Sequence, residues 1–293
     1  MPALLALVAA AVAMGISPVF VRWADVGPDT SAFWRVALAL PALWAWMRLE
    51  ERGATPSRAF SRPAILAGLA FSGDLFFWHL SILNTSVANA TFFATTAPVF
   101  VALAGWLLMG ARPGRNVLAG LALCLLGGAA LVSASFALAP QHVLGDGFGL
   151  CTALFFGLYF LAVSAARDKA GAARVTFQLS CVTALVLLCI ALVFERRFWP
   201  ASPSGWAALL ALALISHAGG QGLLSVALGR LPPLFSSLVI FLEAIAAALF
   251  GWLLLGEPVG LAQALGGVLI LAGIFVARPR DANRGGAAPS GLS

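Results

Sequence analysis

The segment GWLLLGEPVGLAQALGGVLILAG, residues 251–273, has a counterpart in the first half of the chain, GWLLMGARPGRNVLAGLALCLLGG, residues 105–128. The two segments align at a constant offset of 146 residues, at which GWLL recurs together with four further glycine pairs. These pairs are Gly110/Gly256, Gly114/Gly260, Gly120/Gly266 and Gly127/Gly273. Membrane helices rich in Leu and Gly resemble one another by chance, but a shared register at half the chain length favours a duplicated structural unit.

The composition places this unit in a membrane. Of the 293 residues, 61% are hydrophobic and 10% are charged, whereas soluble domains carry about 25% charged residues. Apolar segments long enough to cross a hydrocarbon layer of about 30 Å recur along the whole chain. We therefore expect an all-α integral membrane protein with ten transmembrane helices. The expected spans are 4–22, 30–48, 63–84, 89–109, 115–134, 147–165, 174–195, 205–227, 233–255 and 261–277.

Ten spans divide into two units of five, and an odd number of crossings makes the two copies run in opposite senses. Weaker similarity around Gly15 and Gly157, near the start of each half, fits this division. We predict two inverted five-helix repeats, residues 1–140 and 141–278, around a central cavity, followed by a disordered cytoplasmic tail, 279–293. Inverted repeats are typical of secondary transporters, in which the substrate site lies near the midplane where the halves meet.

The basic residues predict the orientation of the chain. With ten spans, thirteen of the 17 Lys and Arg residues fall on the side of both termini, and three, Arg22, Arg196 and Arg197, fall on the other side. Loops rich in Lys and Arg remain in the cytoplasm, so both termini are expected there, in a bacterial inner membrane. The formal net charge of +6 therefore reflects membrane topology, and no nucleic-acid partner is expected.

The layout resembles a known family. The ten spans, the two similar halves, AFWR at 32–35 and GWLLLGEP at 251–258 are similar to the drug/metabolite transporter superfamily, EamA type. The resemblance covers nearly the whole chain and, more weakly, extends to the YddG-like amino-acid exporters. It implies a ten-helix carrier of small metabolites.

The chain also departs from this family pattern. The glutamate that ends such a half is Glu257 in the second copy, but Ala111 stands at that position in the first. The proline of the family's P-V motif is Pro98 in the first copy and Ala244, preceded by Glu243, in the second. This asymmetry predicts a site that the two halves do not share equally.

Polar and ionisable side chains at membrane depth mark the candidate site. Ionisable groups there cost roughly 2.5–3.5 kcal/mol on insertion scales and usually face a cavity or a partner. Asp74, His217 and Glu243 lie near the middle of the third, eighth and ninth spans, and Thr95 precedes Pro98 in the fourth. The candidate substrate-binding residues are Asp74, Trp78, His79, Thr95, Tyr159, His217, Gln221 and Glu243.

Spacing along the helices supports several of these assignments. Trp78 shares a helix face with Asp74 and could stack on a substrate ring or fill space. His217, Gln221 and Ser225 follow one another at intervals of four residues, so they share one face and are expected to line a water-filled path. Thr95, with Thr96, could satisfy backbone groups that a kink at Pro98 leaves free.

Structural alternatives remain for the charged candidates. Asp74 could be hydrogen-bonded to Ser72 or to a neighbouring helix, and Glu243 could form an ion pair with Arg35 or His217. Arg35 lies about one turn inside the second span, where we expect it at the outer rim of the bundle, either snorkelling to the interface or guiding anionic groups.

These residues fit a secondary transporter that exports small metabolites by alternating access, with amino acids, aromatic and other apolar ones included, as the expected substrates. Glu243 or Asp74 would bind the ammonium group, and His217, Gln221 or a helix N-terminus would bind the carboxylate. The alternative is proton-coupled efflux of lipophilic drugs or cations, and a passive channel is a third reading. Neither GxxxxGK[ST] nor HExxH occurs, so we expect no ATP coupling within this chain, no enzyme activity and no cofactor. The expected partners are a small-molecule substrate, the lipid bilayer and, for coupled transport, protons.

Overall fold

The computed structural model describes residues 2–52, 60–85, 87–110, 112–133, 143–256 and 260–278. Three sequence predictions fall outside these ranges. They are the glutamate position occupied by Ala111 and Glu257, the boundary between the halves at 140/141, and the tail 279–293.

The described residues form helices and contain no strand, which confirms the predicted all-α class. In chain order the helices are α1 (Pro2–Gly15), α2 (Ser17–Trp23), α3 (Pro28–Ala37), α4 (Leu40–Glu50), α5 (Arg62–Asn84), α6 (Val87–Ala94), α7 (Ala97–Met109), α8 (Arg115–Val132), α9 (Val143–Arg167), α10 (Ala172–Phe194), α11 (Pro203–Ala211), the π-helix η2 (Leu212–Gln221), α12 (Gly222–Leu228), α13 (Pro233–Val239), α14 (Leu242–Leu255) and α15 (Leu261–Ala277).

Several spans that were expected as single helices are interrupted. Prolines lie at the start of α2, α4 and α7, where Pro18, Pro41 and Pro98 occupy the first turn. Proline has no N–H to donate and clashes with the preceding turn, so each one ends the helix before it. The break between α13 and α14 contains no proline and is closed by tight backbone bonds, from Phe241 N to Leu238 O and from Glu243 N to Ile240 O.

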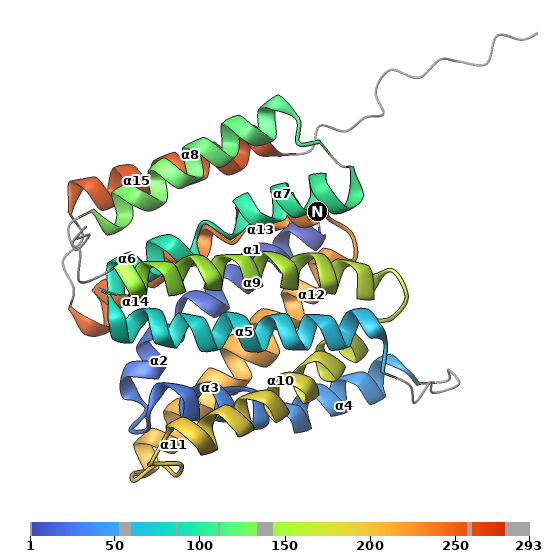
Figure 1. Ribbon diagram of the computed structural model, residues 1–293, viewed down its shortest axis with the longest axis vertical. Coiled ribbons are helices and arrows are strands. Elements are labelled where there is room, and N and C mark those ends of the chain that lie inside the picture. Colours follow the sequence, from blue (N-terminus) through green and yellow to red (C-terminus); the bar gives the residue numbers. More distant parts are fainter. Residues whose placement is uncertain are drawn as a thin grey trace, which may run out of the picture.

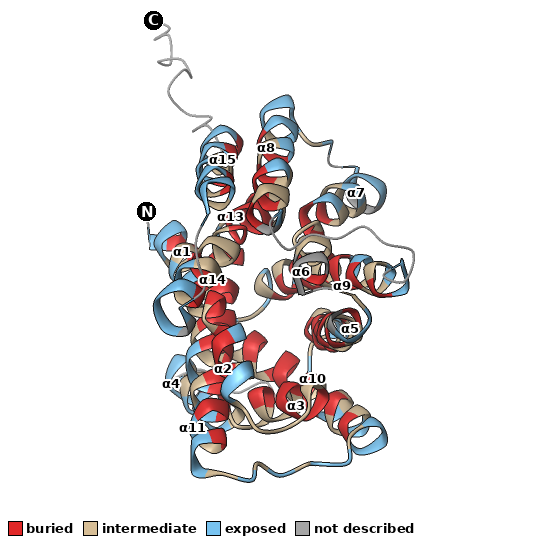
Figure 2. Cartoon of the chain, turned by 90° about the vertical axis from the view of Figure 1, so that its left-hand side faces the viewer, coloured by how far each residue is buried: buried red, intermediate tan, exposed pale blue. Residues whose placement is uncertain are grey.

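Within the described ranges, six helical segments are long and apolar enough to cross a membrane. They are Pro2–Trp23, Arg62–Ser81, Val143–Arg167, Ala172–Phe194, Pro203–Leu228 and Pro233–Leu254. Three shorter apolar helical segments, Phe92–Leu107, Arg115–Leu131 and Leu261–Ala277, accompany them. In Figure 1 the long helices run side by side, and successive segments reverse direction along the chain. Exposed stretches run along α15 (Figure 2). The large apolar residues Trp252 on α14 and Leu265 and Phe275 on α15 are exposed, as expected for helices in contact with lipid.

Helix α5 lies at the centre of one group of helices and packs against α9 and α10, and most of its surface is buried (Figure 2). A second group forms around α1, which packs against α14, η2 and α12. Helix α10 also contacts α12 and so joins the two groups. The space between the groups holds the polar residues described below.

Glycines of the repeated segment bring α8 and α15 into backbone contact. A Cβ at Gly120 would lie 2.5 Å from the carbonyl oxygen of Gly273, and a Cβ at Gly127 would lie 2.6 Å from that of Gly266. Between these contacts, the Sγ of Cys124 lies 3.7 Å from the carbonyl oxygen of Ile270. Only glycine permits so close an approach, which explains why these positions carry glycine in both segments.

A second pair of contacts follows the same pattern. A Cβ at Gly157 would lie 3.3 Å from the Ala97 carbonyl oxygen, and a Cβ at Gly15 would lie 2.9 Å from the Glu243 carbonyl oxygen. Residues 97 and 243 are separated by the same offset of 146 that relates the repeated segments. The helices that hold Gly157 and Gly15 therefore pack on two segments that are separated by this same offset.

Candidate functional site

A cavity lies where α1 to α3, α5, α7, α9 and the α13–α14 break come together. The cavity has a volume of ≈ 160 Å³, whereas a single buried water occupies about 10–15 Å³ of such a cavity. The cavity can therefore hold a small molecule. Its wall consists of Met14, Ser17, Pro18, Arg35, Phe71, Asp74, Leu75, Trp78, Ala94, Thr95, Ala97, Pro98, Thr152, Phe156, Phe160, Gln221, Ser237, Ile240, Phe241, Glu243, Ala244 and Ala247.

Three charged side chains from three helices meet at this wall: Arg35 from α3, Asp74 from α5 and Glu243 from α14. The guanidinium of Arg35 interacts electrostatically with both carboxylates, although no ion pair within 4 Å joins these described groups. Arg35 and Asp74 are 8% and 9% exposed. The prediction that Arg35 lies at the outer rim is therefore wrong, because α3 turns this side chain inwards, towards the two acids.

Two helix breaks border the cavity, at positions separated by the same offset of 146 residues. The break between α6 and α7 holds Thr95, and the break between α13 and α14 holds Phe241. The Thr95 hydroxyl donates to the Phe92 carbonyl at 2.7 Å, and the Thr96 hydroxyl donates to the Phe93 carbonyl at 2.7 Å. This confirms the expectation that the threonines satisfy backbone groups next to Pro98. Discontinuous helices with exposed backbone groups are a common way to build a transporter site.

Aromatic side chains form much of the remaining wall. Phe71 and Trp78 come from α5, Phe156 and Phe160 from α9, and Phe241 from the α13–α14 break. The rings of Phe156 and Phe160 meet edge to face, with centroids 5.0 Å apart. The cavity therefore combines a small charged group with a large apolar surface, an arrangement typical of small-molecule sites.

Two predicted site residues, Tyr159 and His217, lie behind this wall and do not line the cavity. The Tyr159 hydroxyl donates to Gln221 Oε1 at 2.7 Å, and the Gln221 amide reaches the Met14 sulfur at 3.2 Å. His217 Nε2 lies 2.8 Å from the Ser180 hydroxyl on α10, and its ring packs 5.7 Å from that of Phe71.

The water-lined stripe predicted on the eighth span is therefore only partly present. Of its three members, Gln221 reaches the cavity. His217 and Ser225 face α10 instead, where Ser225 Oγ contacts the Ala172 carbonyl at 3.4 Å. Neighbouring helices supply the partners that water would otherwise provide.

His79 lies outside the cavity wall, towards the start of α3. Its Nδ1 is 4.0 Å from the Asp29 carboxylate, and its ring meets that of Trp78 edge to face at 5.1 Å. The Asp29 backbone N–H donates to Glu195 Oε1 at 2.9 Å. Burial, with the neighbouring Glu195 carboxylate, raises the pKa of Asp29 to about 6. Asp29 precedes the expected second span, so these acids lie at one end of the bundle.

Sequence reasoning missed several residues at the cavity wall. Ser17 and Thr152 are buried, and their hydroxyls have no hydrogen-bond partner within the described chain. Neither stands out in the sequence, because single Ser and Thr residues are common in membrane helices. Among the described residues, no group of three or more His, Cys, Asp or Glu side chains could hold a metal ion.

Comparison with known proteins identifies the family. The model of the EamA-like transporter family matches residues 1–133 and 143–278. The chain belongs to the EamA-like transporter family. This confirms the resemblance stated from the sequence and makes the protein a multi-pass membrane transporter.

Relatives of this family member are similar over almost their whole length. An uncharacterized transporter of Archaeoglobus fulgidus is 29% identical over 276 residues, which cover 93% of this chain and 94% of the relative. A second uncharacterized transporter of the same organism is 26% identical over 259 residues, covering 86% and 88%. A protein of known crystal structure has the same fold, with a TM-score of 0.81 at 20% identity over 94% of this chain and 96% of its own.

Proposed function

We propose that this EamA-family protein is a secondary transporter that exports small metabolites, foremost amino acids with aromatic or other apolar side chains, by alternating access. The observation that carries this proposal is the central cavity, where two carboxylates and a guanidinium adjoin an aromatic wall. A free amino acid has the complementary parts: an ammonium group, a carboxylate and an apolar side chain.

The wall supplies a partner for each part of such a substrate. Asp74 and Glu243 offer acceptors for the ammonium group, and in both cases the carboxylate forms no hydrogen bond to another described residue. Phe71, Trp78 and Phe156 offer aromatic surface for the side chain. In this proposal Gln221 and Thr95 contribute polar contacts at the wall, and Tyr159 and His217 act from behind it by holding Gln221 and Phe71.

Two inverted halves, residues 1–140 and 141–278, are part of the proposal, and the helix contacts support them. Gly120 meets Gly273 while Gly127 meets Gly266, and Cys124 meets Ile270. Gly120 and Gly266 are 146 residues apart, as are Gly127 and Gly273, so the offset maps the first glycine contact onto the second. Cys124 and Ile270 are themselves 146 residues apart, so their contact maps onto itself. Two antiparallel helices related by a two-fold axis produce this pattern, and the family model also matches two separate stretches of the chain.

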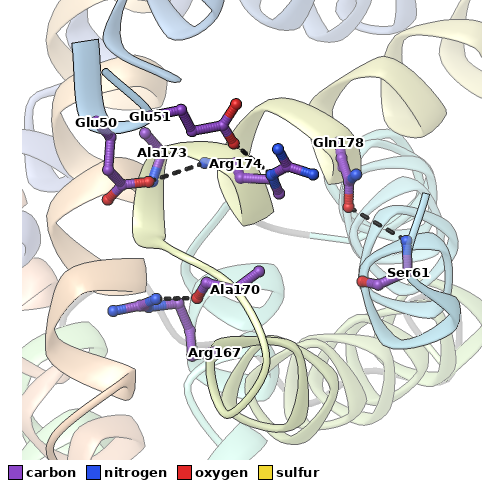
Figure 3. Close-up of polar contacts among 8 residues, drawn as sticks. All are labelled: Glu50, Glu51, Ser61, Arg167, Ala170, Ala173, Arg174 and Gln178. Carbon is purple, nitrogen blue, oxygen red and sulfur yellow. Dashed lines mark hydrogen bonds and ion pairs between the residues drawn. The ribbon is translucent and has the colours of Figure 1, made fainter. Parts of the chain in front are cut away.

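Alternating access needs closures at both ends of the cavity, and two carboxylate caps at equivalent positions are candidates. Glu50, at the end of α4, accepts from the backbone N–H of Ala173 in the first turn of α10, at 3.1 Å (Figure 3). Glu195, directly after α10, accepts from the backbone N–H of Asp29 in the first turn of α3, at 2.9 Å. One cap joins the end of α4 to the start of α10, and the other joins the end of α10 to the start of α3. The caps therefore lie at opposite ends of α10, so release of one cap would open one side of the cavity.

The orientation is proposed from the basic loops: because loops rich in Lys and Arg stay in the cytoplasm, both termini would lie in the cytoplasm of a bacterial cell. The cap made by Glu50 would then lie on the cytoplasmic side, close to Arg167 and Arg174 (Figure 3). The cap made by Glu195 would lie on the outer side.

Efflux of lipophilic cations in exchange for protons is the second candidate. It is favoured by the same two carboxylates in an aromatic cavity. Arg35 at the same wall counts against it, because a buried guanidinium repels a permanent cation.

Counterflow of radiolabelled amino acids into liposomes that contain the purified protein tests the proposal. Without an ion gradient, saturable uptake against preloaded unlabelled substrate, competed by other amino acids, is the expected result. Absence of counterflow with every amino acid tested would overturn the amino-acid proposal, and uptake of lipophilic cations driven by a pH gradient would support the second candidate instead.

A further inference from the structure

Arg35 is the most enclosed charged side chain of the cavity wall. It lies in the last turn of α3, is 8% exposed and lines the cavity together with Asp74 and Glu243. Its Nε has no hydrogen-bond partner within the described residues. No ion pair within 4 Å engages its guanidinium in that part of the chain either.

A cation in this position is costly without a direct partner. An arginine carries five N–H donors and does not lose its proton in proteins. Burial of a charge is tolerated where the charge is paired and hydrogen-bonded. Longer-range attraction to Asp74 and Glu243 supplies part of the compensation, but the donors remain free to bind another group.

We propose that Arg35 is the specificity-determining residue that binds the carboxylate of the substrate, and so restricts the cavity to α-amino acids over the corresponding amines. This inference rests on the proposed function and names the residue that recognises the acidic group. A planar guanidinium matches a carboxylate through two parallel N–H···O bonds, which is stronger and more directional than contact with a lysine ammonium.

The surroundings of Arg35 fit a zwitterion better than a simple anion. Asp74 and Glu243 lie at the same wall and would repel a ligand that has only negative charge. An ammonium group next to the carboxylate removes this repulsion, because it pairs with one of the acids while the carboxylate pairs with Arg35. Ser17 and Thr152 add buried hydroxyls at the wall without partners in the described chain.

Competition in the counterflow assay tests the inference. Labelled L-phenylalanine is the transported probe, and unlabelled L-phenylalanine and phenethylamine, which lacks the carboxylate, are the competitors. The wild type is expected to bind phenylalanine about ten- to a hundredfold more tightly than the amine, the range for a hydrogen bond to a charged group. In Arg35→Gln this preference should fall towards one. Arg230→Gln, which removes an exposed basic residue outside the cavity, should keep the wild-type preference.

A second variant covers the case in which Arg35→Gln does not fold. Arg35→Lys keeps the charge but loses the planar fork, so the preference for phenylalanine over phenethylamine should fall by about tenfold. A purely structural arginine would change the amount of folded protein and leave this ratio intact.

The outcomes separate the two proposals. Counterflow by the wild type with an unchanged competitor ratio in folded Arg35 variants would overturn the role of Arg35 and leave the amino-acid proposal standing. No wild-type counterflow of any amino acid would overturn the proposed function, and this inference with it.

Discussion

Gln221 reaches the cavity because Tyr159, behind the wall, and Met14, at the wall, hold its amide. Tyr159 donates to its carbonyl oxygen at 2.7 Å, and its amide nitrogen contacts the Met14 sulfur at 3.2 Å. All three side chains are at least 98% enclosed. At the scale of single residues, the cavity wall therefore depends on a second layer of contacts, as binding sites commonly do.

Tyr159→Phe tests this layer. The variant leaves the buried carbonyl oxygen of Gln221 without its donor, so we expect a loss of about 1–3 kcal/mol in unfolding free energy. Thermal unfolding of the purified protein in detergent measures the change. Ser133→Ala removes an exposed hydroxyl bond to the Ala130 carbonyl and should have little effect. Equal stability of Tyr159→Phe and wild type would contradict a supporting role.

Asp29 should make stability depend on pH. Its pKa is raised from 3.8 to about 6 by burial and by Glu195, so the folded state binds the proton more tightly than the unfolded state does. Stability should therefore increase as pH falls from 7 through 6 towards 4, and the gain is absent above that window.

Asp29→Asn should remove this part of the pH dependence. Comparing the melting temperatures of both proteins at pH 7.5 and pH 5 measures it, with the His79 ring 4.0 Å away unchanged in each. If both proteins gain equally on acidification, Asp29 is not the responsible group.

The sequence predicted several residues that line the cavity, but not the inward direction of Arg35 or the packing partner of His217. Asp74, Trp78, Thr95, Gln221 and Glu243 were named as candidates, and all five line the cavity. The predicted position of Arg35 at the rim was wrong because a basic residue one turn inside a span usually extends to the interface. His217 was expected to face water. Instead, α10 packs against the eighth span and supplies Ser180 as a partner for His217. This packing cannot be derived from a single sequence.

At the scale of helices, the contact between α8 and α15 depends on glycine. A Cβ at Gly127 would lie 2.6 Å from the carbonyl oxygen of Gly266, whereas a Cβ at Gly105 on α7 would have nothing within 4 Å. Both glycines belong to the segment 105–128, so the effects of alanine at a crowded position and at an open position can be compared directly.

Gly127→Ala should separate α8 from α15 and cost about 1–3 kcal/mol, as overpacking does. Gly105→Ala should leave stability unchanged or slightly higher, because alanine favours the helix. Thermal unfolding of both variants measures the contrast. Similar melting temperatures for the two would show that this crossing is looser than the backbone geometry indicates.

The carboxylate caps should stabilise the helices that they cap. Loss of a capping group costs about 0.5–2 kcal/mol, so Glu50→Ala and Glu195→Ala should each lower the unfolding free energy by that amount. Arg230→Ala changes an exposed side chain and serves as the control, with an expected cost of less than about 0.5 kcal/mol. Equal costs for all three variants in denaturant titrations would argue against capping.

Helix ranges followed well from apolar run lengths, whereas helix interruptions followed only in part. Pro98 predicted the break between α6 and α7, and the hydroxyls of Thr95 and Thr96 act there as expected. The equivalent break between α13 and α14 contains no proline, and the π-helix η2 has no sequence signature beyond its glycines. Both depend on tertiary contacts, such as that of Gly15 with the Glu243 carbonyl.

At the level of the whole molecule, the proposed repeat would relate contacts that are far apart in the chain. Three kinds of contact each occur twice. They are the glycine contacts between α8 and α15, the close packing of Gly15 and Gly157 on a neighbouring backbone, and the carboxylate caps made by Glu50 and Glu195. The charged residues of the cavity do not repeat in this way. Ala97 stands 146 residues before Glu243, so in this proposal the two halves do not contribute equally to the site.

In the proposed function, the cavity is the transport site and opens to the two sides of the membrane in turn. Labelling of Ala244→Cys, a cavity position, tests it most directly in a variant whose four native cysteines are replaced by serine. In liposomes, a membrane-impermeant thiol reagent should modify the introduced thiol from either side, and phenylalanine should slow the reaction from both. Modification from one side only, at a rate that phenylalanine does not change, would contradict the account.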